Sequence, residues 1–98
     1  MSGGKDMPAK GRSLPERVED VLVEHDCLQH AHMGWQVVND VKKVGWEKAK
    51  YFVSNFSPSQ LGKRDLIGLR RLAKIRRDRP EVFNEVMKEL EGIFGGAE

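Results

Sequence analysis

Basic side chains are concentrated in one short part of the sequence, between residues 63 and 79. This segment holds eight Lys and Arg residues and two acidic residues, whereas the formal net charge of the 98-residue chain is only +2. A helix is predicted from about Lys63 to Arg77, and at 100° per residue its apolar positions share one side. Those positions are Leu66, Leu69, Leu72 and Ala73. The opposite side carries six of the cations together with Ile67, an apolar residue that the predicted core does not need.

A rigid row of cations of this kind can bind phosphate groups. Each phosphate that it neutralises releases counterions, so such a helix binds polyanions. Arginine outnumbers lysine six to two in the segment, and its guanidinium forms the paired hydrogen bonds that phosphate and guanine accept, while Ile67 offers a contact for a thymine methyl group. The sequence therefore predicts a DNA- or RNA-binding site, with regulatory DNA binding favoured. Its residues are Lys63, Arg64, Ile67, Arg70, Arg71, Lys74, Arg77 and Arg79.

Further contacts are expected from residues that precede this helix. They are Lys48, Lys50, Tyr51 and Ser57. Tyr51 lies off the apolar stripe of its own predicted helix, which makes it the best candidate for an exposed aromatic contact. Trp35, Trp46, Phe52 and Phe56 are expected in the core, in preference to a platform on which bases stack.

Two alternatives remain open at this point. The segments 13–31 and 81–98 each carry five acids and one base, so their carboxylates could neutralise the basic helix within the molecule. A cationic face can also dock on an acidic partner protein, and an apolar seam at Ile93 and Phe94 could join two chains or bind a partner helix. Nucleic-acid binding requires that the cationic face stay open.

All three histidines and the single cysteine lie in one stretch, at His25, Cys27, His30 and His32. These residue types bind metals, but on one helix His25 and Cys27 point about 160° apart. No metal and no cofactor are therefore expected. Glu24 and Asp26 flank the thiol, whereas a reactive cysteine needs an electropositive setting, and no nucleophile or phosphate-loop motif is present. The chain is predicted not to be an enzyme and to have no small-molecule substrate.

The remaining pattern predicts an all-α bundle of about five short helices. Apolar residues at three- and four-residue steps predict helices over about 14–30, 34–44, 46–56, 63–77 and 80–94. Capping boxes at Ser13 and Ser57, and Asp78 before Pro80, mark three helix starts. Residues 1–12 and 95–98 are expected to be disordered, around a single domain at 13–94.

A helix-turn-helix resembles the layout of the third and fourth predicted helices, but the spacing does not fit. The connection from Ser54 to Gly62 is longer than the usual three- to four-residue turn. No apolar run is long enough to cross a bilayer, so no membrane contact is expected. One cysteine rules out an internal disulfide and is typical of a cytoplasmic protein.

Overall fold

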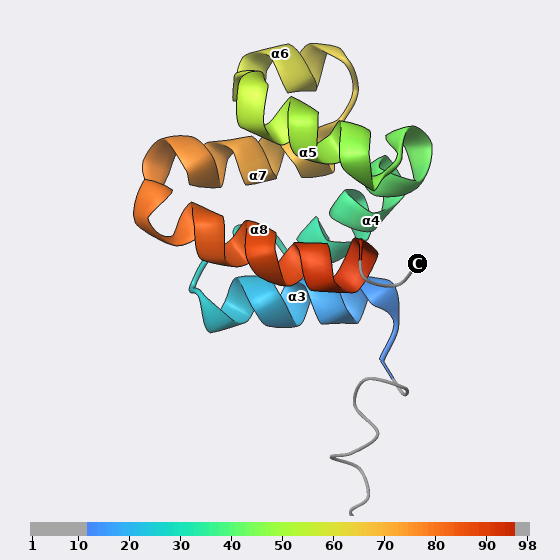
Figure 1. Cartoon of the computed structure of the whole chain (residues 1–98), viewed down its shortest axis with the longest axis vertical. Coiled ribbons are helices and arrows are strands. Elements are labelled where there is room, and N and C mark those ends of the chain that lie inside the picture. Colours follow the sequence, from blue (N-terminus) through green and yellow to red (C-terminus); the bar gives the residue numbers. More distant parts are fainter. Residues whose placement is uncertain (1–11, 96–98) are drawn as a thin grey trace, which may run out of the picture.

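Six helices joined by short turns account for most of residues 12–95, the part of the chain that the computed structural model describes (Figure 1). They are α3 (Leu14–Glu24), α4 (Met33–Val44), α5 (Trp46–Asn55), α6 (Pro58–Lys63), α7 (Ile67–Asp78) and α8 (Pro80–Phe94). No strand occurs within residues 12–95. The all-α prediction is confirmed, with one more helix than expected because the turn predicted after Ser57 is the separate helix α6. The predicted tails lie outside the described residues except for Arg12 and Gly95.

The first helix begins as predicted and ends earlier. The Ser13 hydroxyl accepts a hydrogen bond from the Glu16 amide, and the Glu16 carboxylate accepts one from the Ser13 amide at 3.0 Å. The chain leaves the helix after Glu24, because Asp26 adopts a left-handed conformation with φ of 56°. The amide of Cys27 then donates to the Leu22 carbonyl at 2.7 Å, a hydrogen bond typical of a Schellman C-terminus. The predicted extension to His30 is therefore wrong.

The boundary between α7 and α8 also differs from the prediction. Asp78 is the last residue of α7 and does not cap α8, whose N-cap is Arg79 with no side-chain cap hydrogen bond. Pro80 alone forces the break, since a proline cannot continue the hydrogen bonding of the preceding helix. Asp78 instead binds the neighbouring Arg77.

The core is formed by apolar side chains from every helix. Fully buried examples are Val18, Leu22, Val37, Val53, Leu61, Leu69, Leu72 and Leu90. Figure 1 shows α3 and α8 side by side at one end of the molecule, with α6 at the other end and α7 between them. No helix within residues 12–95 combines the length and the apolar character that a membrane span requires.

The apolar seam predicted at the end of α8 is used inside the molecule. Ile93 is buried in the core, and the Phe94 ring stacks on Trp46 with their centroids 5.1 Å apart. Ile93 is therefore covered by the chain itself, and Phe94 is half-buried.

Candidate nucleic-acid interface

The basic helix α7 follows α6 through a three-residue turn, Arg64 to Leu66. Asp65 is left-handed with φ of 62°, and the Leu66 amide donates to the Leu61 carbonyl at 3.1 Å. This is a second Schellman C-terminus, and Leu61 and Leu66 are both buried beneath it. The turn has the length found in helix-turn-helix units. Lys63 thus belongs to α6 and Arg64 to the turn, whereas the sequence placed both at the start of the basic helix.

The N-terminus of α7 is capped by a side chain from α4. The buried carboxylate of Asp40 accepts hydrogen bonds from the amides of Gly68 at 2.6 Å and Leu69 at 3.0 Å. Burial raises the pKa of Asp40, and the two backbone donors offset part of that rise. Since these amides are occupied, the end of α7 offers no free anion site. Asp40 lies off the apolar stripe of Val37, Val38 and Val41, which predicts that it faces outward, and its burial shows that this prediction is wrong.

The apolar side of α7 is buried as predicted, and the opposite side is accessible. Leu66, Leu69, Leu72 and Ala73 are in the core, and Ile75 joins them. The accessible side carries Arg70, Lys74 and Ile67, all half-buried. Arg70 and Lys74 make no ion pair or side-chain hydrogen bond with any residue in the range 12–95, and neither does the exposed Lys63 of α6.

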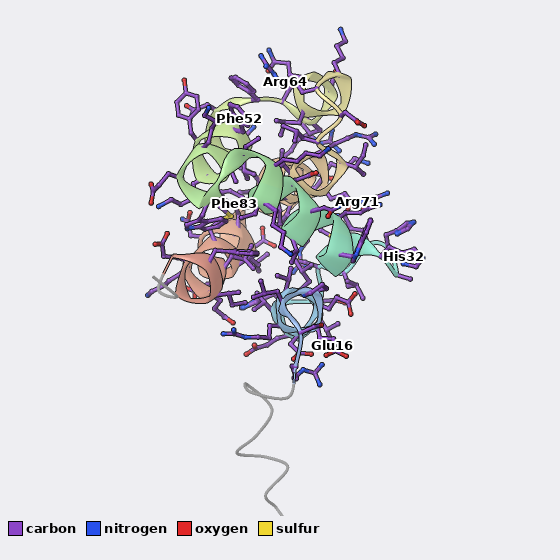
Figure 2. All side chains as sticks on the ribbon, turned by 90° about the vertical axis from the view of Figure 1, so that its right-hand side faces the viewer. Glu16, His32, Phe52, Arg64, Arg71 and Phe83 are labelled. Atoms are coloured by element: carbon purple, nitrogen blue, oxygen red, sulfur yellow. The ribbon has the colours of Figure 1, made fainter. Side chains whose placement is uncertain are left out.

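Two further cations extend this surface without meeting a carboxylate in the described part of the chain. The Arg71 Nε donates to the Gln36 side-chain oxygen at 3.2 Å. The Arg64 guanidinium lies over the Phe56 ring, 4.8 Å from its centroid. Figure 2 shows Arg64 at the end of the molecule remote from Glu16, with Arg71 between these two ends. We call Lys63, Arg64, Arg70, Arg71 and Lys74 the open cationic surface.

Arg77 and Arg79 are engaged with the protein itself. The Arg77 guanidinium binds Asp78 at 2.7 and 3.0 Å, and this hydrogen-bonded pair lowers the pKa of Asp78. Arg79 donates to the carbonyls of Asp26 at 2.8 Å and His25 at 3.3 Å, and it also contacts Glu81. Arg79 therefore holds the turn after α3 against the start of α8.

One arginine of α7 outside the predicted site has a structural role. Arg76 donates to the carbonyls of Val53 at 2.7 Å and Phe56 at 3.1 Å, at the C-terminal end of α5. A cation is favoured there because it satisfies the last carbonyls and the negative end of the helix dipole.

The acidic helices α3 and α8 direct most of their paired carboxylates away from α7. Glu91 accepts hydrogen bonds from the Trp46 Nε1 at 2.8 Å and the Lys50 Nζ at 2.9 Å, and both lower its pKa. Glu89 binds His25 at 2.7 Å, and Asp20 binds Arg12 at 2.8 Å. Apart from the pair of Glu81 with Arg79, no ion pair within residues 12–95 joins these helices to the basic segment.

The auxiliary residues occupy different settings. Lys48 is exposed, whereas Lys50 is held by Glu91 and Glu47. The Ser57 hydroxyl accepts from the Gln60 amide as the N-cap of α6, as its capping box predicts. The Tyr51 ring is exposed and meets Phe56 edge-on at 6.1 Å.

The sequence reasoning missed Trp35 and its neighbours on α4. Trp35 is 57% exposed and lines a hollow of about 190 Å³. The other residues that line it are Gln36, Asn39, Asp40, Lys43, Asp65 and Ile67. Its placement in the core is wrong. Helical geometry carries the missed signal, because position 35 lies more than 100° from the Val37, Val38 and Val41 stripe on average and on the side of Asn39.

The histidines and the cysteine do not gather into one site. Cys27 is buried, and burial raises the pKa of its thiol. The only group of three potential metal ligands within residues 12–95 is Glu24, His25 and Glu89, whose ligand atoms lie within 4.8 Å of one another. It excludes Cys27, His30 and His32, and the His25 Nε2 is already hydrogen-bonded to Glu89.

Comparison of the chain with protein-family models, with curated proteins and with solved structures found no significant match.

Proposed function

We propose that this chain is a small non-catalytic protein that binds nucleic acid through the open cationic surface. The observation that supports this most directly is the pairing pattern of α7 and its neighbours. Five cations on α6, the following turn and α7 form no ion pair within residues 12–95. One of them, Lys74, acts only through space on the Asp78 carboxylate, which Arg77 already binds. The net charge of the chain is only +2, but these unpaired cations give one part of its surface a high local positive charge. Local positive charge of this kind attracts a polyanion.

The mode of contact follows from the arrangement around α7. The Asp40 carboxylate occupies the N-terminal amides of α7, so side chains and not the helix end must bind phosphates. Arg70 and Lys74 are one helical turn apart and point to the same side, which suits adjacent phosphates of one strand. Arg71 and Arg64 are positioned by Gln36 and Phe56, which limits the conformational entropy that binding would remove.

The α6–turn–α7 unit also supports the proposal. A short helix, a three-residue turn and a longer basic helix form the layout in which the second helix of DNA-binding proteins enters the major groove. We assign the phosphate contacts to Arg70, Arg71 and Lys74, with Lys63 and Arg64 as flanking contacts. Arg77 and Arg79 have internal partners and are assigned lesser roles.

The test is a double charge reversal, Arg70→Glu with Lys74→Glu. Both residues lack partners within the described region, so the variant should keep its helical circular dichroism and its unfolding midpoint. Its affinity for labelled duplex DNA, single-stranded DNA and RNA, measured by fluorescence anisotropy at low salt, should fall by more than about 100-fold, the loss of two charged hydrogen bonds.

The matched control is Arg17→Glu with Lys88→Glu. It also removes one Arg and one Lys, so it has the same net charge as the double reversal on α7, but its changes lie on α3 and α8. Its affinity should stay within about twofold of the parent, after allowance for the long-range field. If both variants lost the same affinity, net charge alone would explain the effect and the proposal would be wrong. The proposal would also be wrong if the variant with Arg70 and Lys74 reversed still bound polyanions.

A further inference from the structure

Trp35 combines a large apolar side chain with a position beside the open cationic surface. Its exposed fraction is 57%, whereas that of Trp46, the other tryptophan, is 8%. A single exposed apolar residue is common on proteins and means little alone. Trp35, however, borders two hollows on the same side of α4, one with His32 and Gln36 and one with Gln36, Asn39 and Ile67.

The second hollow has the size and chemistry of a site for one planar group. Its volume of about 190 Å³ is below the range of about 300–1,000 Å³ that drug-sized ligands occupy. Gln36 and Asn39 each present a carbonyl acceptor and an amide donor, the two kinds of group found on the edge of a nucleobase. The Lys43 ammonium also lines it and lies 3.5 Å from the carbonyl oxygen of Asp65. Two acidic residues complete the lining: Asp65, and Asp40, whose carboxylate is bound by the amides of α7.

The hollow is continuous with the phosphate-binding residues of α7. Gln36 lines it and accepts the hydrogen bond from Arg71, and Ile67 lines it from the accessible side of α7. Figure 2 shows Arg71 and His32 on the same side of the molecule. A strand whose phosphates lie on Arg71 and Lys74 would thus pass its bases beside the Trp35 indole.

We propose that Trp35 and this hollow bind one unpaired base of a nucleic-acid strand whose backbone lies on α7. The inference rests on the proposed function and adds to its phosphate contacts a base contact that only a single strand or a duplex with an unpaired base can make. The bases inside a duplex already stack on their neighbours, so only an unpaired base has a face free for the indole. An indole can stack on any base, whereas hydrogen bonds to the side-chain amides of Gln36 and Asn39 would favour some bases over others.

The test compares Trp35→Ala and Trp35→Phe on four probes of equal strand length. The probes are a 15-nucleotide single-stranded DNA, the matching RNA, the same DNA with abasic sites, and a blunt duplex. Trp35→Ala should weaken binding to the two intact single strands by about 5- to 140-fold, the range that one lost stacking contact produces. It should leave the blunt duplex and the abasic strand within twofold, and Trp35→Phe should retain most of the affinity.

Tryptophan fluorescence supplies a second readout. Because Trp46 is buried, base stacking on Trp35 should quench the parent protein with intact single strands and should quench Trp35→Phe far less. Val23→Ala, which trims a side chain that is 59% exposed on α3, controls for a general loss of apolar surface and should change neither readout. The DNA and RNA arms identify which sugar the strand carries.

The outcomes separate this inference from the proposed function. If Trp35→Ala binds single strands as the parent does while the charge reversal on α7 abolishes binding, the base site is wrong and the function stands. Equal losses on the blunt duplex and the single strand would also overturn the base site, because no unpaired base is then involved. If the parent binds none of the four probes at low salt, both proposals fail.

Discussion

Glu91 joins two helices, α8 and α5, through one carboxylate. It projects from α8 and accepts hydrogen bonds from Trp46 at the start of α5 and from Lys50 one turn later. The contact fixes the edge of α8 on which Phe94 stacks against Trp46. These two donors favour the ionised carboxylate, which is why its pKa lies below the ordinary value.

We expect Glu91 to make folding sensitive to acid. Its pKa is lower in the folded chain than in the unfolded chain, so its stabilisation is present above about pH 4.5 and is lost as the pH falls through the folded pKa. Glu91→Gln should lower the urea midpoint at pH 7 and flatten the loss of stability below pH 4.5. Glu85→Gln, an exposed change on the same helix, is the control for the loss of one carboxylate. If the urea midpoints of Glu91→Gln equalled those of the parent protein both at pH 7 and below pH 4.5, the assignment to Glu91 would be wrong.

Single residues also explain where the sequence-based reasoning failed. Asp26 and Asp65 both adopt left-handed conformations that end a helix, and each is followed by a buried residue, Cys27 or Leu66. Glycine is the usual residue at such positions, so aspartate there did not mark the ends of α3 and α6. Asp40 was missed for a different reason, since a buried carboxylate is recognised only when its backbone donors on another helix are known.

At the scale of elements, the packing of α4 against α7 positions the open cationic surface. The two helices contact each other with Gln36 beside Arg71 and Asp40 beside Gly68. A Cβ atom on Gly68 would lie 2.4 Å from the backbone of Gln36. Glycine is therefore required by the close approach of the two backbones.

We expect Gly68→Ala to force α4 and α7 apart. The backbone cannot yield as a flexible side chain can, so overpacking should cost about 1–3 kcal/mol or more in the free energy of unfolding. The midpoint of thermal unfolding should fall by roughly 4–8 °C for each kcal/mol lost.

Gly92→Ala on α8 is the natural comparison for this change. A Cβ at Gly92 meets no atom within 4 Å among the described residues. Because alanine restricts the unfolded chain and favours a helix, this variant should gain about 0.4–1 kcal/mol. If both alanine variants shifted stability in the same direction, the close contact at Gly68 would not be the cause.

Element types were predictable because each helix carries its own local signals. The capping boxes at Ser13 and Ser57 lie where the sequence placed them. The buried side of α7 was equally predictable, since the periodicity of its apolar residues alone defines it. Which cations form ion pairs could not be predicted from the sequence, because that depends on which helices become neighbours.

At the scale of the whole molecule, charge is segregated. The acidic helices α3 and α8 pack on each other at one end and bind their own basic partners, Arg12, His25 and Lys50. The basic helix α7 contacts α4, α5 and α6 and also α8, yet its accessible cations meet none of those carboxylates except through Arg79. A polyanion approaching the α6–α7 end therefore meets positive charge with the acidic helices set away from it.

This segregation predicts a steep salt dependence that one titration can measure. If all five cations of the open cationic surface contact phosphates, the logarithm of the binding constant should fall with the logarithm of salt concentration with a slope of about −4.5 on duplex DNA and about −3.5 on single strands. Removing Arg70 and Lys74 should reduce the magnitude by about 2, one for each lost contact, while Arg17→Glu with Lys88→Glu should leave the slope unchanged. A parent slope near −1 would mean that only one phosphate is neutralised, and in that case α7 would not carry the binding. Because counterion release depends on the number of phosphates contacted and not on the net charge of the protein, the slope separates a built phosphate surface from a weak general attraction.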